Sequence, residues 1–198
     1  MKSKLVSNNE MSLFLRNIAE HNEVLADLHR LDADLQRLGN LASQALRQAG
    51  KILFCGNGGS AADCQHLAAE LTGRFIGDRR PLAAIALSTD TSALTCIAND
   101  YSFNEVFARQ VAGLGRKEDL LIGISTSGNS ENVIRAVEEA NKLGMHTVGL
   151  LGRDGGKLRE ICGHSIVVPS QSTARIQECH ILIGHTLCGL IEQELNLI

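Results

Sequence analysis

Four polar side chains form two pairs whose spacing would suit a reaction centre. His66 and Glu70 lie four residues apart and Gln177 and His185 lie eight apart, so each pair projects from one face of a helix. Imidazole nitrogens with carboxylate and amide oxygens can bind a divalent metal, zinc above all. The same groups can instead move protons. Each pair taken alone is also typical of surface or capping residues, and the spacing leaves open whether the two helices meet.

Two loops of small residues have the composition of a ligand-binding cradle. Residues 55–60 read Cys-Gly-Asn-Gly-Gly-Ser, and their glycines let a ligand approach the backbone closely. Residues 125–130 read Ser-Thr-Ser-Gly-Asn-Ser and place hydroxyls beside free N–H groups at a helix start, where the dipole favours an anion. Neither loop has G-x-G-x-x-G spacing or the lysine of a Walker A loop. The pattern favours the phosphate of a small metabolite over a nucleotide, with a plain helix-capping turn as the alternative.

The elements that must position these groups are short apolar runs that alternate with helix-like segments. This alternation predicts βαβ units and a parallel sheet covered by helices on both faces. The two loops follow the first and third predicted strands, and such sheets bind ligands beyond the carboxyl ends of their strands. The predicted strands are residues 52–55, 83–87, 120–124, 147–151 and 165–168. The predicted helices are residues 60–74, 90–98, 103–114, 129–143, 156–162 and 173–195.

The N-terminal part of the chain has a different pattern. Apolar residues recur every three, four or seven positions across residues 11–50, which predicts a helical hairpin that stops at Gly50. Such a hairpin can cover its own domain or pack against another copy of the chain. These apolar positions exceed what one sheet face needs, so we favour contact between copies. The sequence contains no repeat, low-complexity tract or linker, and we predict a single domain over residues 1–198.

Composition excludes several classes of protein. The chain has 198 residues and is 44% hydrophobic. Its formal net charge of −3 gives no electrostatic reason to expect binding to nucleic acid or to an anionic membrane. No apolar stretch approaches the about eighteen residues of a membrane span, and the first ten residues lack the apolar core of a secretion signal. The six cysteines form no C-x-x-C pair. We therefore expect reduced thiols and a cytoplasmic protein.

Five motifs, taken together and in order, resemble those of the phosphoheptose isomerases, which are enzymes with the SIS fold. The likeness runs from about residue 9 to residue 198, and the ordered set is specific although each motif is weak alone. The motifs are Gly56-Asn57-Gly58-Gly59-Ser60, then His66-x-x-x-Glu70-Leu-Thr-Gly-Arg74, then Ala98-Asn99-Asp100, then Gly123-Ile-Ser-Thr-Ser-Gly-Asn-Ser130, then Arg175-Ile-Gln177-Glu178-x-His180-x-x-x-x-His185.

The resemblance implies a flavodoxin-like fold, a three-layer α-β-α sandwich with a five-stranded parallel sheet and additional N-terminal helices. It implies conversion of sedoheptulose 7-phosphate into D-glycero-D-manno-heptose 7-phosphate, the first step towards the activated heptose of lipopolysaccharide core. It also implies cytoplasmic homotetramers with one zinc ion per subunit. The metal ligands carried over are His66, Glu70, Gln177 and His185. The substrate contacts are Asn57, Gly58, Gly59, Ser60, Glu70, Asn99, Asp100, Ser125, Thr126, Ser127, Ser130 and Gln177.

Ketose–aldose isomerisation through an enediol needs one group for the carbon-bound proton and another for the oxygens. We assign Glu70 as the base and His185 as the partner acid. A carboxylate committed to zinc is a weaker base, so either the coordination loosens during turnover or zinc polarises the substrate oxygens. The sequence leaves both possibilities open.

Three other functions fit parts of the pattern. A non-catalytic SIS protein that binds the bacterial replication initiator shares several motifs, but it needs neither Glu70 nor His185. A sugar-phosphate sensor would need an attached DNA-binding region, and residues 1–40 are neither basic nor long enough for one. An isomerase of another phosphosugar would carry the same loops.

Overall fold

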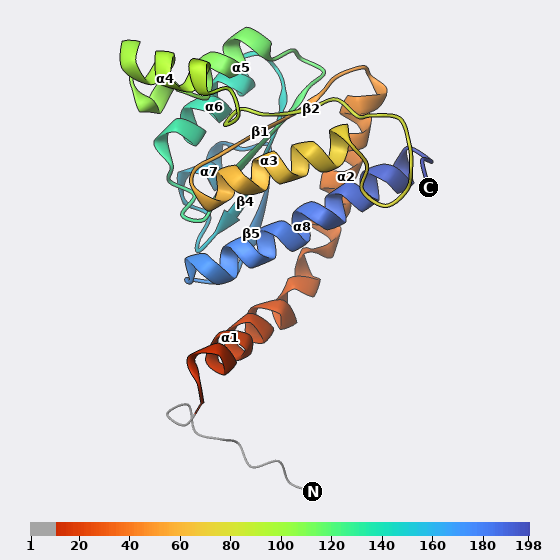
Figure 1. Cartoon of the computed structure of the whole chain (residues 1–198), viewed down its shortest axis with the longest axis vertical. Helices are drawn as coiled ribbons and strands as arrows, with labels where there is room; N and C mark the ends of the chain where they lie inside the picture. The colour runs from red at the N-terminus through yellow and green to blue at the C-terminus, as the bar shows by residue number, and fades with distance from the viewer. Residues whose placement is uncertain (1–10) are drawn as a thin grey trace, which may run out of the picture.

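The computed structural model describes residues 11–198 and contains a five-stranded parallel sheet with the order β2-β1-β3-β4-β5 (Figure 1). The predicted sheet is confirmed. The order reverses at β1, so the loops after β1 and β3 flank the switch point where ligands of such sheets bind. The strands are β1 Ile52–Gly56, β2 Ala84–Ala86, β3 Leu120–Ser125, β4 His146–Gly152 and β5 His164–Val168.

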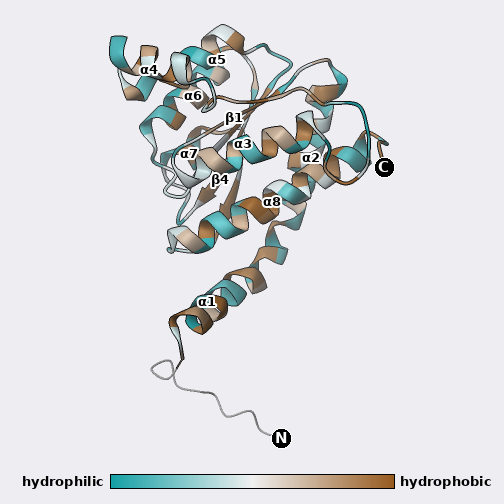
Figure 2. Ribbon diagram, viewed as in Figure 1, coloured by the Kyte–Doolittle hydropathy of each residue, from teal (hydrophilic) through white to brown (hydrophobic). Residues whose placement is uncertain are grey.

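Helices cover both faces of the sheet, because successive strand residues point to opposite sides. Ile52 and Phe54 pack into one buried cluster with residues of α2, α3 and α8, whereas Leu53 and Cys55 pack into a second cluster with residues of α4 to α7. The visible strands, such as β4, are coloured at the hydrophobic end of the scale (Figure 2). The helices are α1 Leu13–Leu28, α2 Asp32–Arg47, α3 Gly59–Thr72, α4 Thr91–Asp100, α5 Ala108–Leu114, α6 Glu131–Lys142, α7 Gly156–Ile161 and α8 Thr173–Glu194.

Two predictions about helices are wrong in detail. The predicted helix at residues 103–114 is divided into the short 3-10 helix η2 Phe103–Glu105 and α5. The chain turns between them at Val106 and Phe107, which are only 0% and 2% exposed, so burying both side chains in the core outweighs regular helix geometry. The predicted hairpin at residues 11–50 is also absent. There α1 continues into α2 through the 3-10 helix η1 His29–Leu31, whose flanking residues keep right-handed helical backbone angles.

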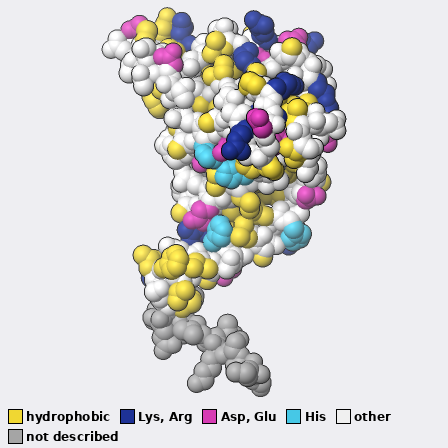
Figure 3. All heavy atoms as spheres, turned by 45° about the vertical axis from the view of Figure 1, so that its right-hand side comes forward, with side chains coloured by type: hydrophobic (Ala, Val, Ile, Leu, Met, Phe, Trp, Pro, Cys, Tyr) yellow, Lys and Arg dark blue, Asp and Glu magenta, His cyan; other side chains and the backbone are white. Residues whose placement is uncertain are grey.

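As a result α1 projects away from the sheet (Figure 1) and buries none of its own residues. Leu13, Phe14 and Leu15 are 66%, 71% and 51% exposed, and Ile18 is 39% exposed. These side chains form a hydrophobic patch, which Figure 3 shows at the end of the described chain. Exposed patches of this kind mark contact sites more often than single exposed hydrophobic residues do.

Within residues 11–198, no helix combines the length and the apolar composition that crossing a bilayer would require. All six cysteines are free thiols. Burial raises the pKa of Cys162 and of Cys188 to about 12 in each case, which keeps these two thiols protonated and unreactive at neutral pH.

Candidate functional site

Three polar side chains converge where α3 packs along α8. The Nε2 atoms of His66 and His185 lie 2.9 Å apart, and His66 Nε2 lies 3.3 Å from Glu70 Oε1. One ligand atom from each of the three residues lies within 4.8 Å of the others. We call His66, Glu70 and His185 the trio. Figure 3 shows histidine side chains reaching the surface on this side of the molecule.

The helices approach closely enough for this because a glycine precedes His185. A Cβ atom at Gly184 would lie 2.6 Å from Leu67 Cδ1, so a larger residue there would force the fully buried Leu67 side chain or the helix itself to shift. The two helices run in the same direction, with Gln177 beside Gly59 and Gly184 beside Leu67. This parallel packing places the His66–Glu70 face of α3 opposite His185.

The donor set of the trio fits a divalent metal. Two imidazole nitrogens and a carboxylate oxygen are ligands that zinc prefers, and bond lengths of about 2.0 Å imply ligand atoms roughly 3.3 Å apart in a tetrahedral site. Two separations, 2.9 and 3.3 Å, are close to that spacing, and the third pair of ligand atoms lies within 4.8 Å. Alternatively, one imidazole donates an N–H to the other's lone pair, which depends on the tautomers. Both arrangements leave the groups in position for acid–base work.

Gln177 lies at the other end of the helix pair. Its amide packs on Gly59, where a Cβ atom would be 2.4 Å from Gln177 Nε2. Gly59 precedes His66 by seven residues, or about 10 Å of helix. The structure therefore brings together three of the four predicted metal ligands, and the fourth lies at the glycine loop. Ligation by Gln177 stays a prediction.

Asp63 is a site residue that the sequence analysis missed. It lies one turn before His66 on α3, and its Oδ2 atom is buried without a hydrogen-bond partner in the described chain. Burial raises the pKa of Asp63, whereas His66 and His185 pull it down. Asp63 therefore places a further carboxyl group near the two imidazoles. Its spacing from His66 and Glu70, three and seven residues, was the available signal.

The serine loop, residues 125–130, folds its hydroxyls together rather than onto the helix behind it. Ser125 Oγ lies 2.9 Å from Ser130 Oγ and 3.5 Å from Ser127 Oγ. Ser130 begins α6 without a side-chain capping hydrogen bond, and Thr126 is half-buried in the same loop. No serine hydroxyl therefore caps α6, but Ser125 Oγ and Ser127 Oγ accept the N–H groups of Gly128 and Asn129 within the loop, at 3.1 and 3.2 Å. The arrangement leaves N–H groups of the first turn of α6 for an anion.

The glycine loop, residues 55–60, is tied to the start of α6, directly after the serine loop. The amide of Asn57 makes reciprocal 2.8 Å hydrogen bonds with Asn132, which is 3% exposed in the first turn of α6. Gly58 has φ +54° with no atom within 4 Å of an added Cβ, so its conformation, not space, demands glycine. Ser60 is only 4% exposed, which favours a packing role over its predicted contact with substrate.

Asn99 and Asp100 lie at the end of α4, on the opposite face of the sheet from the trio. Asn99 Nδ2 donates to Asp100 Oδ1 at 2.8 Å, and Cys96 Sγ donates to Asp100 Oδ2 at 3.4 Å. These two hydrogen bonds lower the pKa of Asp100. Among residues 11–198, no recorded polar contact joins this pair to the trio or to the serine loop, so their predicted role stays a prediction.

His180 anchors α8 to the sheet. It is 1% exposed, and its Nε2 lies 3.0 Å from the carbonyl oxygen of Leu151 at the end of β4. Burial lowers the pKa of His180 to about 4, although the hydrogen bond to Leu151 opposes the shift. The ring is therefore neutral at physiological pH and acts in packing.

This buried histidine should make stability depend on pH. Because the folded pKa of about 4 lies below the unfolded value of about 6.5, the unfolded chain binds the extra proton between those values. Lowering the pH from 7 to 4.5 should thus cost on the order of 2 kcal/mol of unfolding free energy through this residue. Urea unfolding at both pH values, on the wild type and on His180→Gln, measures the difference. An equal loss in both proteins would contradict this prediction.

Comparison with known proteins identifies the family. A family model described as SIS domain matches residues 16–152. A phosphoheptose isomerase from Aliarcobacter butzleri is 54% identical over 186 residues, which cover 93% of this chain and 98% of that protein. One from Nitratiruptor sp. is 65% identical over 150 residues, covering 76% of this chain and 80% of that protein.

Solved structures agree with this result. The structure of a phosphoheptose isomerase from Neisseria gonorrhoeae has a TM-score of 0.86 at 48% sequence identity, with 91% of this chain and 97% of that chain covered. Another, from Francisella tularensis, has a TM-score of 0.84 at 39% identity, with 92% and 100% covered. The chain with the trio and the serine loop therefore belongs to the phosphoheptose isomerases, aldose–ketose isomerases of the SIS domain family.

Proposed function

We propose that this protein converts D-sedoheptulose 7-phosphate into D-glycero-D-manno-heptose 7-phosphate through an enediol, as the first step towards activated heptose for lipopolysaccharide. The observation that carries the proposal is the convergence of His66, Glu70 and His185 between α3 and α8. A protein that only binds a partner needs no such set of acid–base groups. The likeness to the named isomerases supports the same reaction.

The serine loop is the proposed phosphate site. Its hydroxyls donate hydrogen bonds to phosphate oxygens, and the N-terminus of α6 adds free N–H groups and a favourable dipole. Asn57 of the glycine loop is hydrogen-bonded to Asn132 in the first turn of α6, directly after the serine loop, so the two loops are fixed relative to each other. Binding energy from the phosphate, which is remote from the reacting carbons, then positions the substrate for proton transfer.

The trio is the proposed proton-transfer centre. Glu70 takes the proton from the substrate carbon and returns it to the neighbouring carbon, while His185 serves the two oxygens. Glu70 points one oxygen, Oε1, at His66, and a carboxylate has a second oxygen free for proton transfer. Asp63 adds a further carboxyl group near the two imidazoles.

We further propose that His66, Glu70 and His185, with Gln177, hold one zinc ion per subunit. Zinc bound there would supply a Lewis acid for the carbonyl and enediol oxygens. The support is the ligand chemistry and the spacing of the three trio atoms.

The function is tested by incubating the purified protein with sedoheptulose 7-phosphate and following the products by NMR. We expect an aldoheptose 7-phosphate to form. Parallel incubations with a pentulose and a hexulose phosphate test the alternative that another phosphosugar is the substrate. A folded protein that turns over none of them, with or without zinc, would refute the isomerase proposal and support the partner-binding alternative.

Zinc removal should weaken both activity and stability. A ligand that binds only the folded state adds about 2.7 kcal/mol at a hundredfold excess over its Kd, so dialysis against a chelator should lower Tm by several degrees. Zinc should restore Tm and activity, whereas magnesium should restore neither, because magnesium prefers oxygen ligands. A chelated protein with unchanged Tm and activity would leave the trio as an acid–base site without metal.

We also propose that the protein is a cytoplasmic homotetramer whose subunits contact each other through α1 and neighbouring surfaces. The support is the hydrophobic patch at the start of α1 and a hollow lined by Phe14, Ile18 and His21 against α8. Six free cysteines fit a reducing compartment. The formal net charge of −3 gives no support for contact with nucleic acid or membrane.

The assembly proposal predicts that Phe14→Asp dissociates the protein. Phe14 is 71% exposed in one chain, so the substitution should leave the fold of the subunit intact. A charge inside an apolar contact is costly to bury. Sedimentation at micromolar concentration should show smaller species for Phe14→Asp than for Arg16→Asp, an exposed control on the same helix. A wild-type monomer would contradict the proposal.

A further inference from the structure

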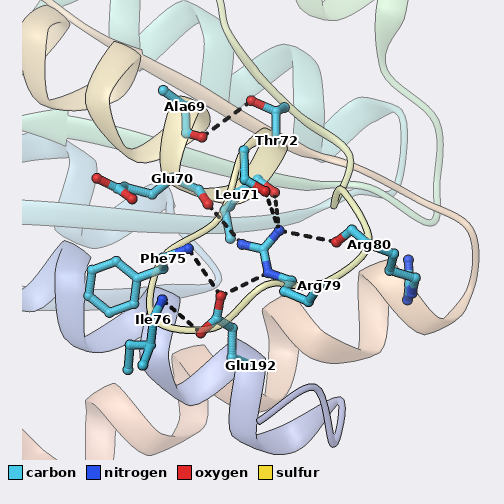
Figure 4. A network of polar contacts seen from close by, with 10 residues as sticks. Ala69, Glu70, Leu71, Thr72, Phe75, Ile76, Arg79, Arg80 and Glu192 are labelled. Carbon is cyan, nitrogen blue, oxygen red and sulfur yellow. Dashed lines mark hydrogen bonds and ion pairs between the residues drawn. The ribbon is translucent and has the colours of Figure 1, made fainter.

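A buried ion pair lies behind the trio, where the loop after α3 meets α8. Arg79 Nε donates to Glu192 Oε1 at 2.8 Å, with the two side chains 2% and 0% exposed (Figure 4). Burial raises the pKa of Glu192, but hydrogen bonds from Arg79 and from the N–H groups of Ile76 and Phe75 outweigh it and hold the pKa below its usual range. We call Arg79 and Glu192 the clamp.

One side of the clamp fixes the end of α3. The guanidinium of Arg79 donates to the carbonyl oxygens of Glu70 and Leu71, both at 2.8 Å, and to that of Gly73 at 3.0 Å. A helix end leaves such carbonyls without partners. Because Glu70 belongs to the trio, the clamp holds the backbone of one trio residue directly.

The other side of the clamp fixes the loop that carries Phe75. Glu192 accepts the N–H groups of Phe75 and Ile76, both at 3.2 Å. The Phe75 ring stacks on the imidazole of His185, with centroids 5.6 Å apart and planes 22° apart. His185 also contacts His66: the two rings meet edge to face, with their centroids 5.0 Å apart.

His185 needs this support because its surroundings are open. A hollow of about 310 Å³, lined by Phe75, Thr186 and Gly189 among others, lies beside it at the surface. Without the Phe75 ring, the half-buried imidazole would have room to rotate away from His66. Stacking restricts the ring to the orientation in which its Nε2 faces His66 Nε2.

We propose that Arg79 and Glu192 are positioning residues for His185, acting through the stacked ring of Phe75. The inference rests on the proposed role of His185 in zinc binding and proton transfer. A buried ion pair is weak support for stability, since well-packed apolar residues often do as well. Residues that orient a metal ligand, in contrast, commonly change metal affinity ten- to a hundredfold when replaced.

The decisive variant is Phe75→Leu in the full-length protein, because it removes the ring and keeps an apolar side chain of similar reach. We expect zinc affinity, measured by competition with a chromophoric chelator, to fall about tenfold. We expect kcat to fall as well with KM within about twofold, because the phosphate site is remote. Phe75→Tyr keeps the ring and should retain zinc affinity and kcat within about twofold. Glu192→Gln should weaken zinc binding as Phe75→Leu does.

A matched control separates positioning from general destabilisation. Asp119 is likewise buried, at 1% exposure, and is ion-paired to Lys51 at 2.5 Å, but its side-chain hydrogen bonds go to Lys51 and the N–H of Arg116, and not to the trio, Phe75 or the clamp. Asp119→Asn should lower Tm and leave zinc affinity unchanged. Equal losses of zinc affinity in Asp119→Asn and Glu192→Gln would overturn the proposal, because the effect would then follow stability alone.

His185→Ala distinguishes failure of the inference from failure of the proposed function. If His185→Ala loses zinc and turnover while Phe75→Leu keeps both, the role of His185 stands and the positioning proposal is overturned. If His185→Ala behaves as the wild type, the proposed function of the trio is wrong and the inference falls with it. If the wild type binds no zinc but isomerises, the proposal is tested by kcat alone. A lower kcat in Phe75→Leu than in Phe75→Tyr supports it, and equal kcat values overturn it.

Discussion

Glu70→Gln should lower kcat for sedoheptulose 7-phosphate by about a thousandfold, within the 10²–10⁴ range of a positioned acid–base group. The amide has the same size and can still contact His66, which lies 3.3 Å from Glu70 Oε1. It cannot accept a proton from carbon. The side chain is 24% exposed, so the neutral replacement should fold normally. Steady-state assays, with Tm as the check on folding, measure the effect.

Two controls show whether the loss reflects the base itself. Zinc content must be measured in Glu70→Gln, because an amide is a weaker ligand than a carboxylate. Exchange of substrate C–H for deuterium in heavy water reports proton abstraction directly and should disappear with kcat. Asp63→Asn removes a nearby negative charge but no member of the trio, so we expect about a tenfold loss, the size of a charge effect on neighbouring groups. Equal losses in both variants would contradict the assignment of Glu70 as base.

Most of the fold could be predicted from the periodicity of the apolar residues. The sheet was predictable because strands buried on both faces are almost continuously apolar, as in residues 120–124, and because glycine- or serine-rich loops follow them. The split of residues 103–114 was not predictable from periodicity, since Val106 and Phe107 are apolar in either arrangement and only the shape of the core selects the turn. The straight path from α1 to α2 likewise depends on no single residue type.

Within the candidate site, the spacing of residues along one helix was predictable from the sequence, but the meeting of two helices was not. The pair His66–Glu70 lies on one helix, so its geometry follows from helical repeat alone. Its meeting with His185 depends on the parallel packing of α3 and α8, which the small residue Gly184 permits. In the sequence, a glycine within a helix indicates only that the helix is less stable there. The resemblance to a family pointed to His185, and the packing gives the physical reason.

The clamp shows what sequence reasoning could not reach. Arg79 and Glu192 are 113 residues apart, and each looks in sequence like an ordinary charged surface residue. Their burial follows from the long loop after α3, which folds back over α8. Phe75 lies in the same loop, and nothing in its type predicts a partner. Contacts of this kind depend on tertiary structure alone, which is where sequence patterns stop being informative.

Gly128→Ala should cost on the order of 4 kcal/mol of unfolding free energy and abolish phosphate binding. Gly128 has φ +67°, which costs an L residue about 1–2 kcal/mol. An added Cβ would also lie 1.9 Å from the carbonyl oxygen of Gly155, and backbone on both sides leaves little room to yield. The N–H of Gly128 donates to Ser125 Oγ at 3.1 Å, so relief of the clash must displace the serine loop itself.

Gly144→Ala is the matched control, because it separates backbone conformation from the clash. Gly144 lies just after the other end of α6 with φ +73°, and a Cβ there would approach only the flexible side chain of Lys117, at 3.8 Å. This variant should cost about 1 kcal/mol and leave KM unchanged. Urea unfolding and titration with inorganic phosphate, followed by NMR, measure both properties. If the two variants lose equal stability and both still bind phosphate, then the contact between residues 128 and 155 is not what shapes the serine loop, and the proposed phosphate site loses its structural basis.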